Sequence, residues 1–98
     1  MFVKICGITR PEDADAAVRA GASAVGFVFW PGSPRAINPR RARAITASLP
    51  PFVTAVGVFV DQPAEYVNGV ADLVQLGAVQ LHGEESADYV GAMNRPVS

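Results

Sequence analysis

The chain has 98 residues, half of them hydrophobic and 17% charged, and its formal net charge is −1. This balance is typical of one small folded domain and excludes a disordered segment. A single cysteine cannot form an internal disulfide, which fits a protein of the reducing cytoplasm. We expect no membrane partner, because no apolar stretch approaches the roughly 18 residues of a membrane helix. Nucleic acid is not expected either, since the basic cluster Arg40, Arg41 and Arg43 fits a solvated helix face.

Short apolar runs alternate with longer Ala-rich segments along the whole chain. Prolines at the start and glycines at the end of the Ala-rich segments are typical helix boundaries. In chain order we predict a strand at Phe2–Cys6, a helix from Pro11 to about Ala20, a strand at Ala24–Phe29, a helix from Pro39 to about Ser48, a strand at Phe52–Val60, a helix from Pro63 to near Gly69 or a little later, a strand at Ala78–Leu81, a helix at Glu84–Met93 and the entry to a fifth strand at Pro96–Val97.

This order predicts an α/β fold of four consecutive βα units. Strands without alternating polarity, linked by helices, favour a parallel sheet that is covered on both sides. Two architectures fit: an open doubly wound sheet, or a (βα)8 barrel, which typically needs about 250 residues. The barrel interpretation therefore requires that residues 1–98 are half of one barrel domain, and we find no linker or second domain in the sequence.

The residues with reactive side chains follow the predicted strands. Active sites of parallel α/β folds lie at the carboxyl ends of strands, where this sequence has Cys6, Asp61 and His82, with the Ser33-Pro34-Arg35 loop after the second strand. Each has a simpler explanation when taken alone: a lone cysteine is usually a small buried hydrophobe. His82 can satisfy a loop, Arg35 can be a solvated charge, and Asp61 is best explained as a loop or cap residue.

Side-chain direction groups two further residues with these. Alternation along a strand places Lys4 on the face of Cys6, and Gln80 on the face of His82. In a barrel interior Lys4 and Gln80 would lie one layer deeper and would need polar partners; alternatively, Lys4 extends to an end of the barrel. We expect no metal, because one His and one Cys do not supply three or four ligands.

Five sequence blocks resemble phosphoribosylanthranilate isomerases in order and spacing. They are Lys4-Ile5-Cys6-Gly7-Ile8-Thr9, Gly26-Phe27-Val28-Phe29, Ser33-Pro34-Arg35, Gly57-Val58-Phe59-Val60 and Val79-Gln80-Leu81-His82-Gly83-Glu84. The resemblance covers the entire chain and implies the first four βα units of a (βα)8 barrel, with the start of strand five.

The resemblance also implies a reaction and roles for four residues. The family catalyses a step of tryptophan biosynthesis, the Amadori rearrangement of N-(5′-phosphoribosyl)anthranilate to 1-(2-carboxyphenylamino)-1-deoxyribulose 5-phosphate, without cofactor or metal. Cys6 matches the family's general base, and Arg35 matches the residue that holds the anthranilate part of the substrate. His82 and Gln80 match positions at the mouth, the barrel end at which the strands finish, and are expected to support the site.

The resemblance stops short of a complete active site. The family's general acid is an aspartate at the end of strand six, and phosphate is bound by loops after strands seven and eight. We therefore expect the 98-residue chain to be inactive alone. Its expected partners are the missing C-terminal half or a second copy, joined through open sheet edges, and a phosphorylated small-molecule substrate. The alternative function is a non-catalytic half-barrel module for structure or self-association.

Overall fold

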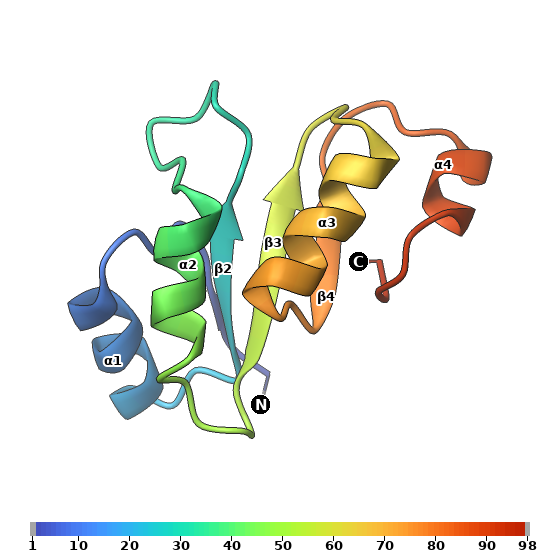
Figure 1. Ribbon diagram of the computed structural model, residues 1–98. Coiled ribbons are helices and arrows are strands. Elements are labelled where there is room, and N and C mark those ends of the chain that lie inside the picture. The colour runs from blue at the N-terminus through green and yellow to red at the C-terminus, as the bar shows by residue number, and fades with distance from the viewer. Residues whose placement is uncertain (1, 98) are drawn as a thin grey trace.

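The computed structural model describes residues 2–97. In these residues four strands alternate with four helices: β1 (Lys4–Ile5), α1 (Pro11–Arg19), β2 (Ala24–Val28), α2 (Pro39–Thr46), β3 (Thr54–Phe59), α3 (Ala64–Val74), β4 (Ala78–Leu81) and α4 (Ala87–Gly91). All four predicted βα units are thus present and in the predicted order (Figure 1).

The four strands form one parallel sheet in the order β1-β2-β3-β4. A doubly wound sheet reverses its strand order at a switch point, whereas here each strand pairs with its neighbour in the sequence. Helices α1, α2 and α3 all cover the same face, and α4 lies beyond β4 (Figure 1). Both features exclude the doubly wound alternative and are those of a barrel segment.

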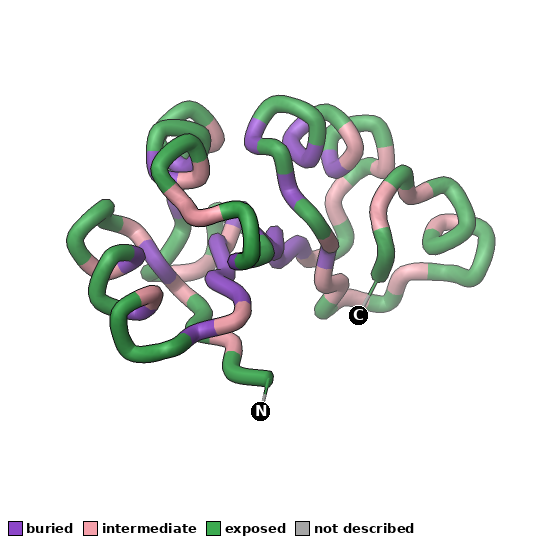
Figure 2. The backbone as a smooth tube through the Cα atoms, turned by 90° about the horizontal axis from the view of Figure 1, so that it is seen from below, coloured by how far each residue is buried: buried purple, intermediate pink, exposed green. Residues whose placement is uncertain are grey.

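The expectation that the sheet is covered on both sides is wrong as far as helices are concerned. Helices cover the outer face only, because in a barrel the inner face of the sheet is enclosed by strands. Seen end-on, the helical turns lie outside an arc and the strands inside it (Figure 2). We call the inner side the concave face. Within the described residues no helix is long and apolar enough to cross a membrane.

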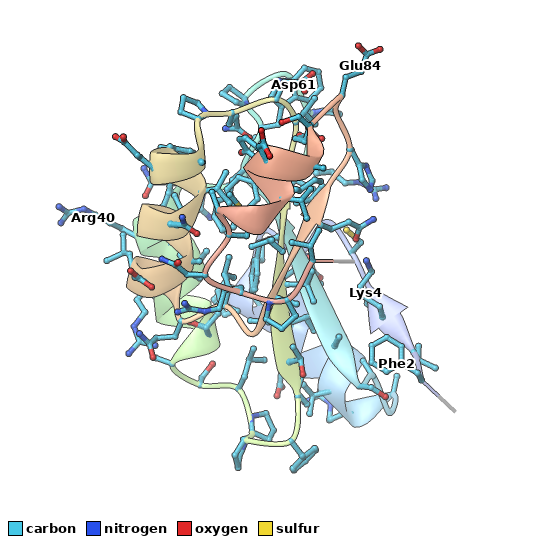
Figure 3. The ribbon with its side chains drawn as sticks, turned by 90° about the vertical axis from the view of Figure 1, so that its right-hand side faces the viewer. Phe2, Lys4, Arg40, Asp61 and Glu84 are labelled. Atoms are coloured by element: carbon cyan, nitrogen blue, oxygen red, sulfur yellow. The ribbon has the colours of Figure 1, made fainter. Side chains whose placement is uncertain are left out.

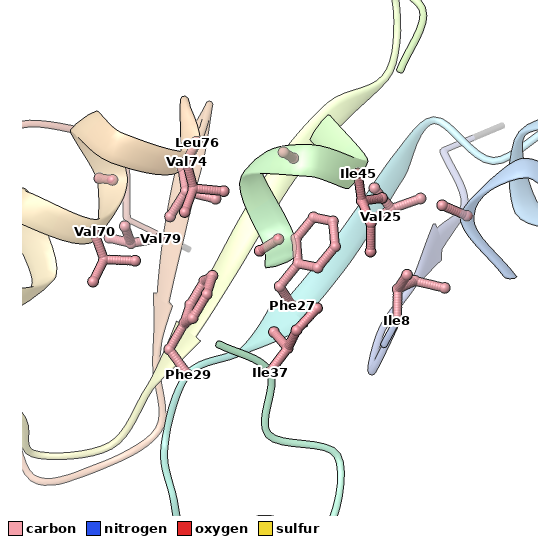
Figure 4. Packing of buried hydrophobic residues seen from close by; sticks show 14 of the residues in the cluster. Ile8, Val25, Phe27, Phe29, Ile37, Ile45, Val70, Val74, Leu76 and Val79 are labelled. Atoms are coloured by element: carbon pink, nitrogen blue, oxygen red, sulfur yellow. The ribbon is translucent and has the colours of Figure 1, made fainter. Parts of the chain in front are cut away.

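The core lies between the sheet and the helices (Figure 4). Alternate residues of the strands point to this side, and Phe27, Phe59 and Val79 are almost fully buried there. The ring of Phe59 stacks on that of Phe29, with centroids 5.4 Å apart. On the helix side the apolar stripe of α3 is buried, namely Val67, Val70, Ala71 and Val74. Burial of these side chains is the main contribution to the stability of the fold.

Local sequence signals explain most helix starts. Pro11 and Pro39 occupy first helical positions, where their missing N–H costs nothing. The side chain of Asn38 accepts a hydrogen bond of 2.8 Å from the Arg40 backbone N–H, and that of Ser86 accepts one of 3.1 Å from the Tyr89 N–H. Both are N-cap bonds that satisfy otherwise unpaired donors.

Three element boundaries differ from the prediction. The first strand is restricted to Lys4–Ile5 because β1 is an edge strand paired only with β2 among the described residues. The third begins at Thr54, since Phe52 lies in an exposed loop. Helix α3 continues past Gly69 to Val74, because its buried stripe extends that far.

The last part of the chain also departs from the prediction. Helix α4 is only Ala87–Gly91, because Glu84 and Glu85 are engaged with the loop after β3. The predicted fifth strand appears as a single parallel bridge between Val79 and Val97. Arg95 holds this segment in place: its Nε donates to the Leu76 carbonyl at 2.7 Å, and its guanidinium pairs with Asp72 at 3.1 Å.

Candidate active site at the carboxyl end of the sheet

The predicted site residues follow strands that all end at the same edge. Cys6 comes directly after β1, Asp61 follows β3, and His82 follows β4. Figure 3 shows Asp61 and Glu84 together at this end, with Lys4 lower down on β1. Parallel pairing therefore gathers, at one end of the sheet, residues that are far apart in the sequence.

The position of Cys6 depends on two glycines. A Cβ placed on Gly26 of β2 would lie 2.8 Å from the Cys6 sulfur, so the thiol occupies the space above this glycine. The carbonyl of Gly26 accepts hydrogen bonds of 3.0 Å from the backbone N–H groups of Gly7 and Ile8. Cys6 itself is free and exposed, so the expectation of a small buried hydrophobe is wrong here.

Arg35 reaches the same place from the loop after β2. A Cβ on Gly7 would lie 2.6 Å from Cδ of Arg35, which shows that the arginine side chain lies across the glycine that follows Cys6. Gly7 also has φ = 84°, a conformation that favours glycine. The loop is fixed by a 3.1 Å bond from the Arg35 N–H to Ser33 Oγ. Because Gly7 has no side chain, the side chain of Arg35 can lie against the backbone of the residue that follows Cys6.

Lys4, Gln80 and His82 form a connected group on the concave face. The ammonium of Lys4 donates a hydrogen bond to Oε1 of Gln80, and Nε2 of Gln80 bonds Nε2 of His82. Lys4 and Gln80 are half-buried and His82 is exposed. The polar partner expected for an interior lysine is therefore Gln80, and Lys4 does not extend to an end of the barrel.

Asp61 has a structural role in the loop, as expected. It adopts φ = 48°, in the left-handed region that Asp tolerates better than most residues. Its Oδ1 accepts a 2.7 Å bond from the Glu84 N–H, and its own N–H donates at 2.9 Å to a Glu85 carboxylate. These bonds tie the loop after β3 to the loop after β4.

No sequence signal pointed to Gln62 and Tyr89, which complete this loop. The Tyr89 hydroxyl donates to the Gln62 carbonyl, and Gln62 Nε2 donates to the Phe29 carbonyl at 3.2 Å. Burial, and then the nearby carboxylates of Glu85 and Asp61, raise the pKa of Tyr89. Neither residue has a distinctive spacing, because their partners are backbone carbonyls set by the tertiary fold.

One pocket of about 400 Å³ lies elsewhere, between α1 and the segment after α2. It is lined by Pro11, Glu12, Ala14, Asp15, Val18, Ser48, Leu49 and Pro50. None of the predicted site residues lines it, and the hydrogen-bonded groups described above are the better guide to chemistry. Within residues 2–97, no three His, Cys, Asp or Glu side chains are grouped so that they could hold a metal ion.

Comparison with known proteins decides the family. Residues 3–98 match the family model of N-(5′-phosphoribosyl)anthranilate (PRA) isomerase. The chain belongs to this isomerase family. The predicted resemblance and the predicted barrel class are therefore confirmed.

Individual relatives are similar to this chain in sequence and in structure. The N-(5′-phosphoribosyl)anthranilate isomerase of Geotalea uraniireducens is 54% identical over 95 residues, which are 97% of this chain and 47% of that protein. The solved phosphoribosyl anthranilate isomerase of Thermotoga maritima superposes with a TM-score of 0.97 at 52% identity, over 99% of this chain and 48% of that one. The chain thus spans about half the length of the isomerases that it matches.

A further solved isomerase carries a ligand. It was crystallised with reduced 1-(o-carboxyphenylamino)-1-deoxyribulose 5-phosphate, and it matches 99% of this chain with a TM-score of 0.97 at 52% identity. The present chain has the same fold over the region that it shares with this relative.

Proposed function

We propose that this chain supplies the half of an N-(5′-phosphoribosyl)anthranilate isomerase that carries the general base. The family reaction is an internal aldose-to-ketose redox step in tryptophan biosynthesis. The observation that supports this proposal most directly is the position of the Arg35 side chain over Gly7, the residue that follows Cys6, at the carboxyl end of the sheet, within a family whose members are isomerases. We expect it to act in the cytoplasm, where a free thiol stays reduced.

In the proposed reaction Cys6 is the general base. After the ribose ring has opened to a Schiff base, its thiolate removes the proton from C2′, and the resulting enolamine tautomerises to the ketone. The thiol is exposed at the end of β1 and held above Gly26, so a substrate carbon can approach it. General base catalysis of this kind is typically worth about 10² to 10⁴ in rate.

Arg35 is proposed to bind the anthranilate end of the substrate. Its guanidinium can pair with the carboxylate in two parallel hydrogen bonds and stack on the aromatic ring. Arg35 is exposed, and its side chain lies over the glycine next to Cys6. This arrangement would place the anthranilate nitrogen, and the sugar attached to it, close to the base.

The general acid and the phosphate grip are proposed to come from the half of its relatives' length that this chain does not span. Asp61 is a carboxylate at the correct end of the sheet, but its oxygen already accepts the Glu84 N–H, and it does not match the family's acid. We therefore expect the 98-residue chain alone to show no turnover. Without the phosphate loops the C2′ proton would not be held against Cys6.

A chimera tests the role of Cys6. Residues 1–98 would be joined to the remaining half of the Thermotoga maritima enzyme, whose structure superposes on 99% of this chain. Turnover is followed by loss of the anthranilate fluorescence of the substrate. Cys6→Ser should reduce turnover at least about 100-fold, because a hydroxyl is a much poorer base, while Ala44→Ser on the exposed face of α2 should leave it unchanged. Near-normal turnover of the Cys6→Ser chimera would show that Cys6 is structural.

Self-association is the alternative that a specific observation favours. Among residues 2–97, strand β1 pairs with β2 alone, and Phe2, Val3 and Ile5 are exposed in and just before it. Unpaired strand edges recruit other strands, so the isolated chain is proposed to form dimers, with two half barrels closing against each other, or larger aggregates. Light scattering at micromolar concentration tests this, and a stable monomer would contradict it.

A further inference from the structure

A side-chain hydrogen bond joins two edge strands of the half barrel across the concave face. Lys4 lies on β1 and Gln80 on β4, the first and last strands of the sheet. The Lys4 ammonium nevertheless bonds Gln80 Oε1, and the other end of the same amide bonds His82. Gln80 is therefore held at both ends, and its orientation depends on Lys4.

The chemistry of the three groups leaves one assignment of the protons. An ammonium has only donors, so the Gln80 atom that faces Lys4 is the carbonyl oxygen. The amide nitrogen then faces His82, and since it too can only donate, Nε2 of His82 must be the acceptor. A neutral imidazole with an accepting Nε2 carries its proton on Nδ1.

We propose that Lys4 is a positioning residue that, through Gln80, fixes His82 as the Nδ1–H tautomer. A free imidazole in water favours the opposite, Nε2–H form, so the contact changes what His82 presents to a ligand. Its remaining nitrogen becomes a hydrogen-bond donor for an acceptor oxygen, such as a carboxylate or hydroxyl group of the substrate.

This assignment of the protons also gives His82 and Cys6 different roles. In the fixed tautomer Nε2 is occupied and Nδ1 is already protonated, so the imidazole has no free lone pair with which to remove a proton. Cys6 is then the base of the site, and His82 orients the substrate. The consequence for catalysis rests on the proposed isomerase function, but the tautomer itself does not.

The tautomer can be measured directly, because His82 is the single histidine of the chain. Labelling with ¹⁵N-histidine gives one pair of ring nitrogens, and two-bond couplings to the ring protons show which nitrogen carries the proton. At about pH 8.5, well above the pKa of a free imidazole, we expect the Nδ1–H pattern. A dominant Nε2–H pattern in the unaltered chain would overturn the proposal without any variant.

Two variants test the part played by Lys4 and Gln80. Lys4→Met leaves the amide free to turn and should move the spectrum toward Nε2–H. Gln80→Glu replaces the amide nitrogen by an acceptor, so Nε2 of His82 must donate and the tautomer should reverse. Arg40→Met is the matched control: it also removes one cation, from an exposed position on α2 (Figure 3), and should leave the spectrum unchanged.

The outcomes separate this proposal from the proposed function. Circular dichroism establishes that each variant is folded, and an unchanged tautomer in folded Lys4→Met would overturn the role of Lys4. If the chimera is inactive but the Nδ1–H pattern is found, the isomerase proposal fails and the positioning role stands. If the chimera is active and the Nε2–H pattern is found, the isomerase proposal stands and the positioning role fails.

Discussion

Replacing Gly26 by alanine should separate the position of the Cys6 thiol from its chemistry. The added methyl group would lie 2.8 Å from the Cys6 sulfur, where ordinary contact begins at 3.4 Å, so the sulfur must retreat by about 0.6 Å. The same methyl would be 3.2 Å from the Cys6 Cα. Because that atom belongs to the backbone, a new side-chain rotamer does not relieve the crowding, and β1 itself must shift.

The expected cost follows from the strength of this strand. Overpacking a well-packed site typically costs about 1–3 kcal/mol. Strand β1 has only two residues and pairs on one side with β2, so it can yield, and we expect a loss of about 1–2 kcal/mol. For a domain of this size that corresponds to a decrease in Tm of roughly 4–8 °C per kcal/mol.

The assay combines unfolding in urea with the reaction of the single thiol. Gly26→Ala should lower the free energy of unfolding and increase the rate at which Cys6 reacts with an aromatic disulfide. Gly69→Ala is the control, since nothing lies within 4 Å of the added methyl in the interior of α3, and it should stabilise the protein by about 0.8–1.0 kcal/mol. If Gly26→Ala is as stable and as slowly modified as the unaltered chain, the thiol does not rest on Gly26 and the described geometry is wrong.

Three further predictions concern the core and the loop beside the site. Phe59→Ala should destabilise the protein by about 3–5 kcal/mol, because this ring is fully buried; a loss below about 1 kcal/mol in urea unfolding would contradict its central position. Asp61→Ala should cost about 1–2 kcal/mol, since it removes the acceptor for the Glu84 N–H and puts alanine at φ = 48°, while Asp61→Asn should stay within about 0.5 kcal/mol. The raised pKa of Tyr89 means that the folded state keeps the phenolic proton more tightly, so this stabilisation is complete below pH 10.0 and is lost as pH rises through the raised pKa. Between pH 10.0 and the raised pKa, the unfolding free energy should therefore decrease less steeply with pH in Tyr89→Phe than in the unaltered chain, and equal slopes in the two proteins would contradict the effect.

Much of the fold was determined by local sequence. Apolar runs and their proline and glycine boundaries predicted all eight elements, and Ala78–Leu81 was predicted to the residue. The predicted boundaries of elements were wrong where contacts with a neighbouring segment determine them. Phe52 has strand character but no partner strand and is 77% exposed, and Glu84 has helix propensity but bonds Asp61 instead.

The candidate site was likewise predicted only in part from the sequence. The sequence indicated Cys6, Arg35, Gln80 and His82, because motif order along the chain was enough to match the isomerase family. Their roles remain predictions. Only the tertiary structure showed that Arg35 lies over Gly7 and that Lys4 bonds Gln80.

The physical reason is the range of the interactions concerned. Helix caps, turns and hydrophobic periodicity are local, so a sequence displays them directly. The orientation of Gln80 depends instead on a cation 76 residues away in the sequence, brought near by the curvature of the sheet. No local sequence pattern indicates that contact, and it is the contact that determines which ring nitrogen of His82 carries the proton.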